Sequence, residues 1–92
     1  MDELNPLAEK IISMLIFEEN FNHILDESGE KRKSVVQDEV KQLIATDYVK
    51  PTANIETGRR SSIHYDSDKM QDYSFQLTGK GMKYLELKLK KI

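Results

Sequence analysis

Apolar side chains recur at every third or fourth position in the first half of the chain, which is typical of helices. The first such segment begins at Asn5 and Pro6. This pair predicts a helix start, because asparagine caps free N–H groups and proline needs no hydrogen bond there. Two adjacent apolar rows follow and make a surface about twice as wide as packing on one core requires. These rows are Leu7, Ile11, Met14 and Leu15, and Ala8, Ile12 and Ile16.

Two further helices are predicted before residue 47. Phe21, Ile24 and Leu25 have the spacing of a short helix, and Gly29 ends it because glycine tolerates positive φ. The next helix is expected over about residues 34–46, with Ser34 as its N-cap. Its inward positions are Val36, Val40, Leu43 and Ile44. Its outward positions are Ser34, Asp38, Lys41 and Ala45, flanked by Gln37 and Gln42.

From Tyr48 onward the apolar period changes towards two, which predicts strands. Residues 48–52 form the first, and Pro51 indicates a strand end or an edge strand because proline has no N–H to donate. Ile63 and Tyr65 alternate with polar residues, as do the apolar residues of 73–77. We therefore expect a hairpin or a three-stranded sheet with one long arm.

The last segment is a predicted helix capped by Thr78. Its apolar residues have a spacing close to that of a coiled-coil seam and are Met82, Leu85, Leu89 and Ile92. Together with Ile12 and Ile16 of the wide first helix, this stripe predicts a homodimer interface. The alternative is that the first and last helices pack on each other within one chain.

The predicted order is helix, short helix, glycine turn, helix, β-arm and helix, in one domain over residues 1–92. Residues 21–29, the apolar positions of 36–43 and the triplet 47–49 resemble a helix-turn-helix. Residues 73–81 are similar to the strand–cap–helix junction of winged helix-turn-helix regulators such as the MarR and PadR families. The resemblance implies an α+β fold with three N-terminal helices. It places the helix-turn-helix at about 21–46, a β-hairpin wing at about 48–77 and a C-terminal helix at about 79–91.

The resemblance also implies sequence-specific binding of double-stranded DNA by a small transcriptional regulator, with the third helix in the major groove and the wing beside it. A helix N-terminus favours phosphate, and arginine is preferred in narrow minor grooves. The basic run 31–33 would contact a phosphate at the helix N-terminus, and the arginines beside Gly58 would enter a minor groove. The residues expected to contact DNA are Lys31, Arg32, Lys33, Ser34, Gln37, Lys41, Arg59 and Arg60.

Charge adds a competing hypothesis. The net charge is −2, but residues 1–29 carry −6 while 30–60 and 61–92 carry +2 each. A small domain polarised in this way can still present one basic face. Asp38, at the centre of the outward face of the third helix, can accept from cytosine but repels phosphate. The acidic total, Asp38 and Glu39 favour the alternative, a winged-helix module that binds protein and not DNA.

The remaining chemistry indicates a protein that is not an enzyme and holds no metal or cofactor. The chain has no cysteine, and its two histidines, His23 and His64, fall on different predicted elements. Ser61, His64 and Asp66 are close in sequence, but nothing indicates the pocket and oxyanion site that a nucleophile needs. The longest apolar run, residues 14–17, has four residues. We expect no contact with membranes and a cytoplasmic location.

Overall fold

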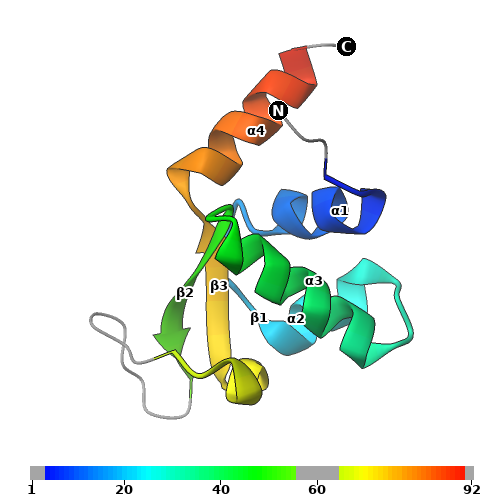
Figure 1. Cartoon of the computed structure of the whole chain (residues 1–92), viewed down its shortest axis with the longest axis vertical. Coiled ribbons are helices and arrows are strands. Elements are labelled where there is room, and N and C mark those ends of the chain that lie inside the picture. Colours follow the sequence, from blue (N-terminus) through cyan, green and yellow to red (C-terminus); the bar gives the residue numbers. More distant parts are fainter. Residues whose placement is uncertain (1–3, 56–64, 91–92) are drawn as a thin grey trace.

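The computed structural model describes residues 4–55 and 65–90, and Figure 1 shows how their helices and strands are arranged. N-terminal helices are followed by an antiparallel β-hairpin and a C-terminal helix, so the predicted α+β class is confirmed. The elements are α1 (Pro6–Met14), β1 (Glu19–Asn20), α2 (Phe21–Ser28), α3 (Lys33–Ala45), β2 (Val49–Asn54), the 3₁₀ helix η1 (Ser67–Asp72), β3 (Tyr73–Leu77) and α4 (Gly79–Lys90).

Helix α1 contacts α2, α3 and α4. It begins as predicted: the Asn5 side chain accepts a hydrogen bond of 2.8 Å from the Ala8 N–H, and Pro6 occupies the first turn. Ala8, Ile11 and Ile12 are completely buried. Contacts within one chain therefore cover most of the wide apolar surface that had suggested a dimer.

Helices α2 and α3 are joined through Gly29, whose φ of 75° is the left-handed conformation that glycine adopts without strain. The inward positions of α3 are confirmed, with Val36, Val40 and Leu43 buried. The predicted N-cap is wrong, because the N-cap of α3 lies two residues before Ser34. Arg32 is the N-cap and makes no side-chain capping bond, so Ser34 lies within the first turn.

The sheet has the strand order β1-β3-β2, and both neighbours pair antiparallel with β3. The predicted alternation in β3 is confirmed: Tyr73, Phe75 and Leu77 are buried, and the residues between them are half-buried. Strand β2 is an edge strand, as Pro51 indicated, and its register shifts between Pro51 and Ala53. The two-residue strand β1 was not predicted.

The segment between β2 and β3 differs from the sequence prediction where it is described. Ile63, part of the expected middle strand, lies outside the described residues. Tyr65 is not in a strand and packs edge-to-face on Tyr73 and Phe75, at centroid distances of 5.0 and 6.1 Å. Burial raises the pKa of Tyr65 to about 12. The helix η1 follows and buries Met70.

Close packing fixes the start of α4. Thr78 caps the helix as predicted, since its hydroxyl oxygen accepts a bond of 3.1 Å from the Gly81 N–H. The same hydroxyl donates to the Asp47 carbonyl oxygen. A Cβ atom at Gly81 would overlap the carbonyl oxygen of Tyr48 and the side chain of Leu77. Glycine is therefore required where α4 crosses the start of β2.

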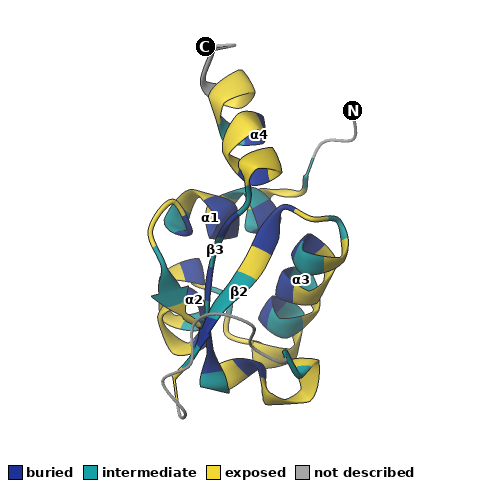
Figure 2. Cartoon of the chain, turned by 90° about the vertical axis from the view of Figure 1, so that its left-hand side faces the viewer, coloured by how far each residue is buried: buried dark blue, intermediate teal, exposed yellow. Residues whose placement is uncertain are grey.

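The core lies between the helices and the buried face of the sheet, as the dark blue segments of Figure 2 show. Helix α4 extends away from this body at its C-terminal end (Figure 1). No helix of the described chain has the length and apolar character needed to cross a membrane.

Candidate nucleic-acid interface

The outward face of α3 carries the residues expected to read DNA, and the structure leaves it bare. Ser34, Asp38, Lys41 and Ala45 are all exposed, while Gln37 is half-buried beside them. The apolar residues of α3 point the other way into the core. The face therefore contributes little to packing and is accessible to a partner.

A cluster of exposed basic residues, which we call the basic cluster, lies at the N-terminal end of α3. It consists of Lys31, Arg32 and Lys33. Lys31 and Lys33 form no ion pair with any residue that the structure describes. Their charges lie where the free N–H groups of a helix also favour an anion.

One acidic residue reduces the charge of the basic cluster. Glu30 accepts hydrogen bonds from the Arg32 N–H at 3.0 Å and from the Arg32 Nε at 3.4 Å. The backbone hydrogen bond from Arg32, followed by that from its side chain, lowers the pKa of Glu30, although burial works against this. The Arg32 side chain is nevertheless 75% exposed, so this pair is a surface contact of small energy.

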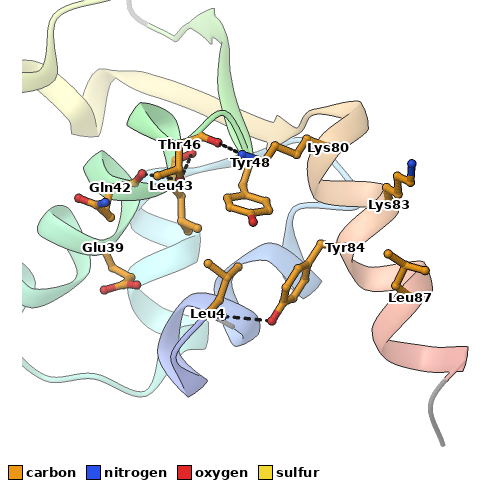
Figure 3. A pocket seen from close by; sticks show the side chains of 10 residues that line it. All are labelled: Leu4, Glu39, Gln42, Leu43, Thr46, Tyr48, Lys80, Lys83, Tyr84 and Leu87. Atoms are coloured by element: carbon orange, nitrogen blue, oxygen red, sulfur yellow. Dashed lines mark hydrogen bonds between the residues drawn. The ribbon is translucent and has the colours of Figure 1, made fainter. Parts of the chain in front are cut away.

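The two acidic residues of α3 point in different directions. Asp38 is exposed at the centre of the outward face. Glu39 instead accepts a bond of 2.8 Å from the Asn5 side-chain nitrogen and lines a pocket beside α4 (Figure 3). Only Asp38 therefore opposes a phosphate backbone placed along the outward face. From the sequence alone, both acids favoured the alternative in which the domain does not bind DNA.

The two arginines predicted for the wing belong to the segment between β2 and β3. Arg59 and Arg60 both fall within 56–64, outside the described residues. The strands that flank this segment, β2 and β3, pair over Val49–Asn54 and Tyr73–Leu77. Strand β2 also packs against α3, so the position of the β2–β3 hairpin is fixed relative to α3.

Of the two α1 residues predicted at a dimer interface, Ile12 is completely buried in the chain's own core. Its side chain has no surface for a second copy, so Ile12 is removed from the expected interface. Ile16 follows the end of α1 and is 43% exposed. In the row formed by Ala8, Ile12 and Ile16, the first two residues therefore belong to the core and the last reaches the surface.

The residue that anchors α4 is one that the predicted stripe did not include. Tyr84 is buried, whereas Met82 is 41% exposed and Leu85 is half-buried. The side chain of Leu89 and all of Ile92 lie outside the described part. The signal for Tyr84 was weak, because an amphipathic aromatic residue near a chain end fits the surface as well as the core.

Hydrogen bonds tie Tyr84 to the N-terminal region. Its hydroxyl accepts a bond of 3.1 Å from the Leu4 N–H and donates one of 2.7 Å to a Glu9 carboxylate oxygen. Lys88 adds an ion pair of 3.0 Å to the same oxygen. The Tyr84 bond, then the Lys88 bond, lowers the pKa of Glu9, while burial raises the pKa of Tyr84. These contacts fix the position of α4 beside α1.

No protein-family model, characterised protein or solved structure matches this chain. Within the described residues, no group of three or more histidine, aspartate or glutamate side chains could hold a metal ion. The exposed face of α3 and the surfaces around it are therefore the features that bear on function.

Proposed function

We propose that this chain is a winged helix-turn-helix domain that binds double-stranded DNA and acts as a non-enzymatic transcriptional regulator. The element order, the strand order β1-β3-β2 and the left-handed turn at Gly29 between α2 and α3 support this assignment. In this proposal α3 enters the major groove and the segment between β2 and β3 is the wing.

The observation that carries the proposal is the bare outward face of α3 with the basic cluster at its N-terminal end. A helix is about 10–12 Å across and fits a major groove about 12 Å wide. Ser34 and Gln37 have the donors and acceptors that base edges require, and Lys41 has a charge for phosphate. Asp38 would accept a hydrogen bond from a cytosine amino group, and elsewhere on DNA it would repel phosphates. It should therefore lower the affinity for random DNA more than the affinity for a preferred site.

Fluorescence anisotropy on a random duplex library, at a low and a physiological salt concentration, tests this function. The net charge of −2 predicts weak general affinity, with a Kd of about 10⁻⁵ M or above at physiological salt. We expect binding at low salt and enrichment of particular sequences. Absence of binding at low salt, with no sequence enriched, would contradict DNA binding.

A protein-interaction module is the second candidate, and the Glu30–Arg32 pair favours it because it offsets part of the basic cluster. The exposed Asp38 supports the same alternative. Retention on heparin separates the candidates: a DNA-binding face requires retention that declines with salt, whereas the interaction module predicts elution with the unbound fraction.

We further propose that two copies associate through the apolar stripe predicted from the sequence at the end of the chain, namely Met82, Leu85, Leu89 and Ile92. Such a two-fold dimer would present both α3 helices to one DNA duplex. Met82→Glu should shift light scattering towards the monomer, while Lys83→Ala, with the same change in charge, should not. A monomer for the unsubstituted chain at high micromolar concentration would contradict the dimer.

A further inference from the structure

A pocket of about 580 Å³ lies between the C-terminal half of α3, the start of β2 and one side of α4 (Figure 3). Its volume falls within the range of about 300–1,000 Å³ that small-molecule sites occupy. Leu4, Leu43 and Leu87 supply apolar surface, and they come from the N-terminal segment, α3 and α4. The pocket therefore has walls from three separate parts of the chain.

Two tyrosines form an ordered aromatic wall. The rings of Tyr48 and Tyr84 meet edge-to-face with centroids 5.7 Å apart. The Tyr84 hydroxyl is held by Leu4 and Glu9, so its ring is fixed in place. The Tyr48 hydroxyl points into the pocket in Figure 3 and makes no hydrogen bond with the described part of the chain. It is thus a free polar group on an otherwise apolar wall.

The α4 side of the pocket is positively charged. The Lys80 ammonium group donates a bond of 2.7 Å to the Thr46 carbonyl oxygen and lies 4.5 Å from the Tyr48 ring centroid. A lysine has three N–H donors, so this contact leaves two of them for a ligand. Lys83, one turn further along α4, also lines the pocket and forms no ion pair with any described residue, and in Figure 3 its ammonium group points away from that of Lys80.

The α3 side has the opposite charge. Glu39 lines this wall, and the Asn5 side chain binds one of its oxygens. A carboxylate here disfavours a second negative group on the ligand. The pocket thus combines an apolar and aromatic interior, two lysines at one side and one acid at the other.

From this combination we infer that the pocket binds a small organic monoanion with a flat apolar body. The anionic group lies at Lys80, Lys83 adds positive charge to the same side of the pocket, and the body lies against Tyr48, Tyr84 and Leu87. A flat body suits the aromatic wall, and the free N–H donors of Lys80 suit an anionic group. This inference does not depend on DNA binding, because none of these side chains belongs to the outward face of α3.

The test uses two probes with the same body, naphthalene-1-carboxylate and naphthalene-1-carboxamide. Each is titrated into the ¹⁵N-labelled full chain, and affinity is measured from amide chemical shifts. We expect the carboxylate to bind about tenfold more tightly than the neutral carboxamide, with the largest shifts at Tyr48, Lys83 and Leu87. Equal affinities, shifts centred elsewhere, or no binding of either probe would overturn the inference.

Variants separate charge from apolar contact. Lys83→Met should weaken carboxylate binding about fivefold and leave carboxamide binding unchanged. Leu87→Ser should weaken both probes. Ile55→Ser is the control, because Ile55 is an apolar side chain that is 51% exposed and does not line the pocket, while Leu87 is 39% exposed and does. An unchanged carboxylate affinity in Lys83→Met, or equal losses in Leu87→Ser and Ile55→Ser, would contradict the assignment.

Discussion

The two ends of α3 are built in contrasting ways. At its C-terminal end, the Thr46 carbonyl accepts from Lys80, the Asp47 carbonyl from the Thr78 hydroxyl, and the Tyr48 carbonyl from the Thr78 N–H. At its N-terminal end, Arg32 provides no side-chain cap, and the basic cluster is exposed. The chain thus fixes one end through α4 and leaves the other to solvent.

This difference indicates which parts of the surface are available for binding. Residues at the C-terminal end are required for the fold, so their substitution would confound any functional test. The basic cluster contributes charge without packing, and surface ion pairs such as Glu30–Arg32 stabilise by about 1 kcal/mol or less. Substitutions at the C-terminal end of α3 should therefore reduce stability, whereas substitutions in the basic cluster should change binding and leave stability nearly unchanged.

Substitution of Gly81 by alanine should produce the largest loss of stability. The new Cβ would overlap the Tyr48 backbone and the Leu77 side chain, so the backbone must move, at a cost of about 3 kcal/mol. Gly79→Ala is the control two residues away, because a Cβ there meets no atom of the described chain within 4 Å. Urea denaturation of both variants measures this. Equal effects would mean that the α4 junction is not closely packed.

The inward face of α3 should rank next. Val40 is completely buried, so Val40→Ala removes buried methyl groups and should cost about 2 kcal/mol. For a domain with about 5–15 kcal/mol in total, this is a visible fraction. Lys41→Ala, on the outward face, should change the free energy of unfolding by less than about 0.5 kcal/mol. Similar losses in thermal denaturation would show that the two faces are misassigned.

Much of the fold could be predicted because strong local signals coincide with tertiary contacts. Asn5 and Pro6 mark the start of α1, Gly29 marks the end of α2, and the alternation in 73–77 marks β3. Strand β1 escaped prediction because its two residues, Glu19 and Asn20, are polar and too few to show a period. Its pairing is specified by β3, which no local pattern reveals.

The candidate site could be predicted only where a local pattern in the sequence reveals it. Helical periodicity identified the outward face of α3, but it could not show that Glu39 turns away towards Asn5. The width of the α1 stripe was ambiguous, since a central helix and a dimer seam have the same pattern. In the folded chain, α1 contacts three other helices and Ile12 is completely buried, so Ile12 belongs to the core. These contacts join residues far apart in the sequence, and no local pattern reveals them.

The anchor of α4 should have a smaller effect than the buried face of α3. Tyr84→Phe removes the bonds to Leu4 and Glu9 and should cost about 1 kcal/mol. Tyr48→Phe is a matched control with the same 6% exposure, because its hydroxyl makes no hydrogen bond with the described chain. Chemical denaturation should rank Tyr84→Phe as the less stable variant, and the reverse order would contradict the anchor.

The same anchor predicts a dependence on pH. Because hydrogen bonds from Tyr84 and Lys88 lower the pKa of Glu9 below its ordinary 4.5, their stabilisation is complete above that value. It is lost as pH falls through the folded pKa. The stability difference between the wild type and Tyr84→Phe should therefore narrow between pH 6 and pH 3. A constant or growing difference would show that Glu9 is not the linked group.

At the exposed end of α3, one substitution should raise stability slightly and reduce binding. Arg32→Ser supplies the missing N-cap and should stabilise the chain by about 0.5 kcal/mol. Arg32→Ala is the control, since it removes the same charge without adding a cap. Both variants should bind a duplex more weakly than the wild type, but only the serine variant should melt at a higher temperature.

The most direct test of DNA binding compares two exposed lysines at opposite ends of the molecule. Lys33→Ala and Lys83→Ala change the net charge equally, but Lys33 belongs to the basic cluster and Lys83 lies on α4. Fluorescence anisotropy against salt should show weaker duplex binding for Lys33→Ala, with the salt slope reduced by about 1. Lys83→Ala should keep the slope of the unsubstituted chain. Equal slopes in all three proteins, or a loss confined to Lys83→Ala, would contradict a DNA interface at the N-terminal end of α3.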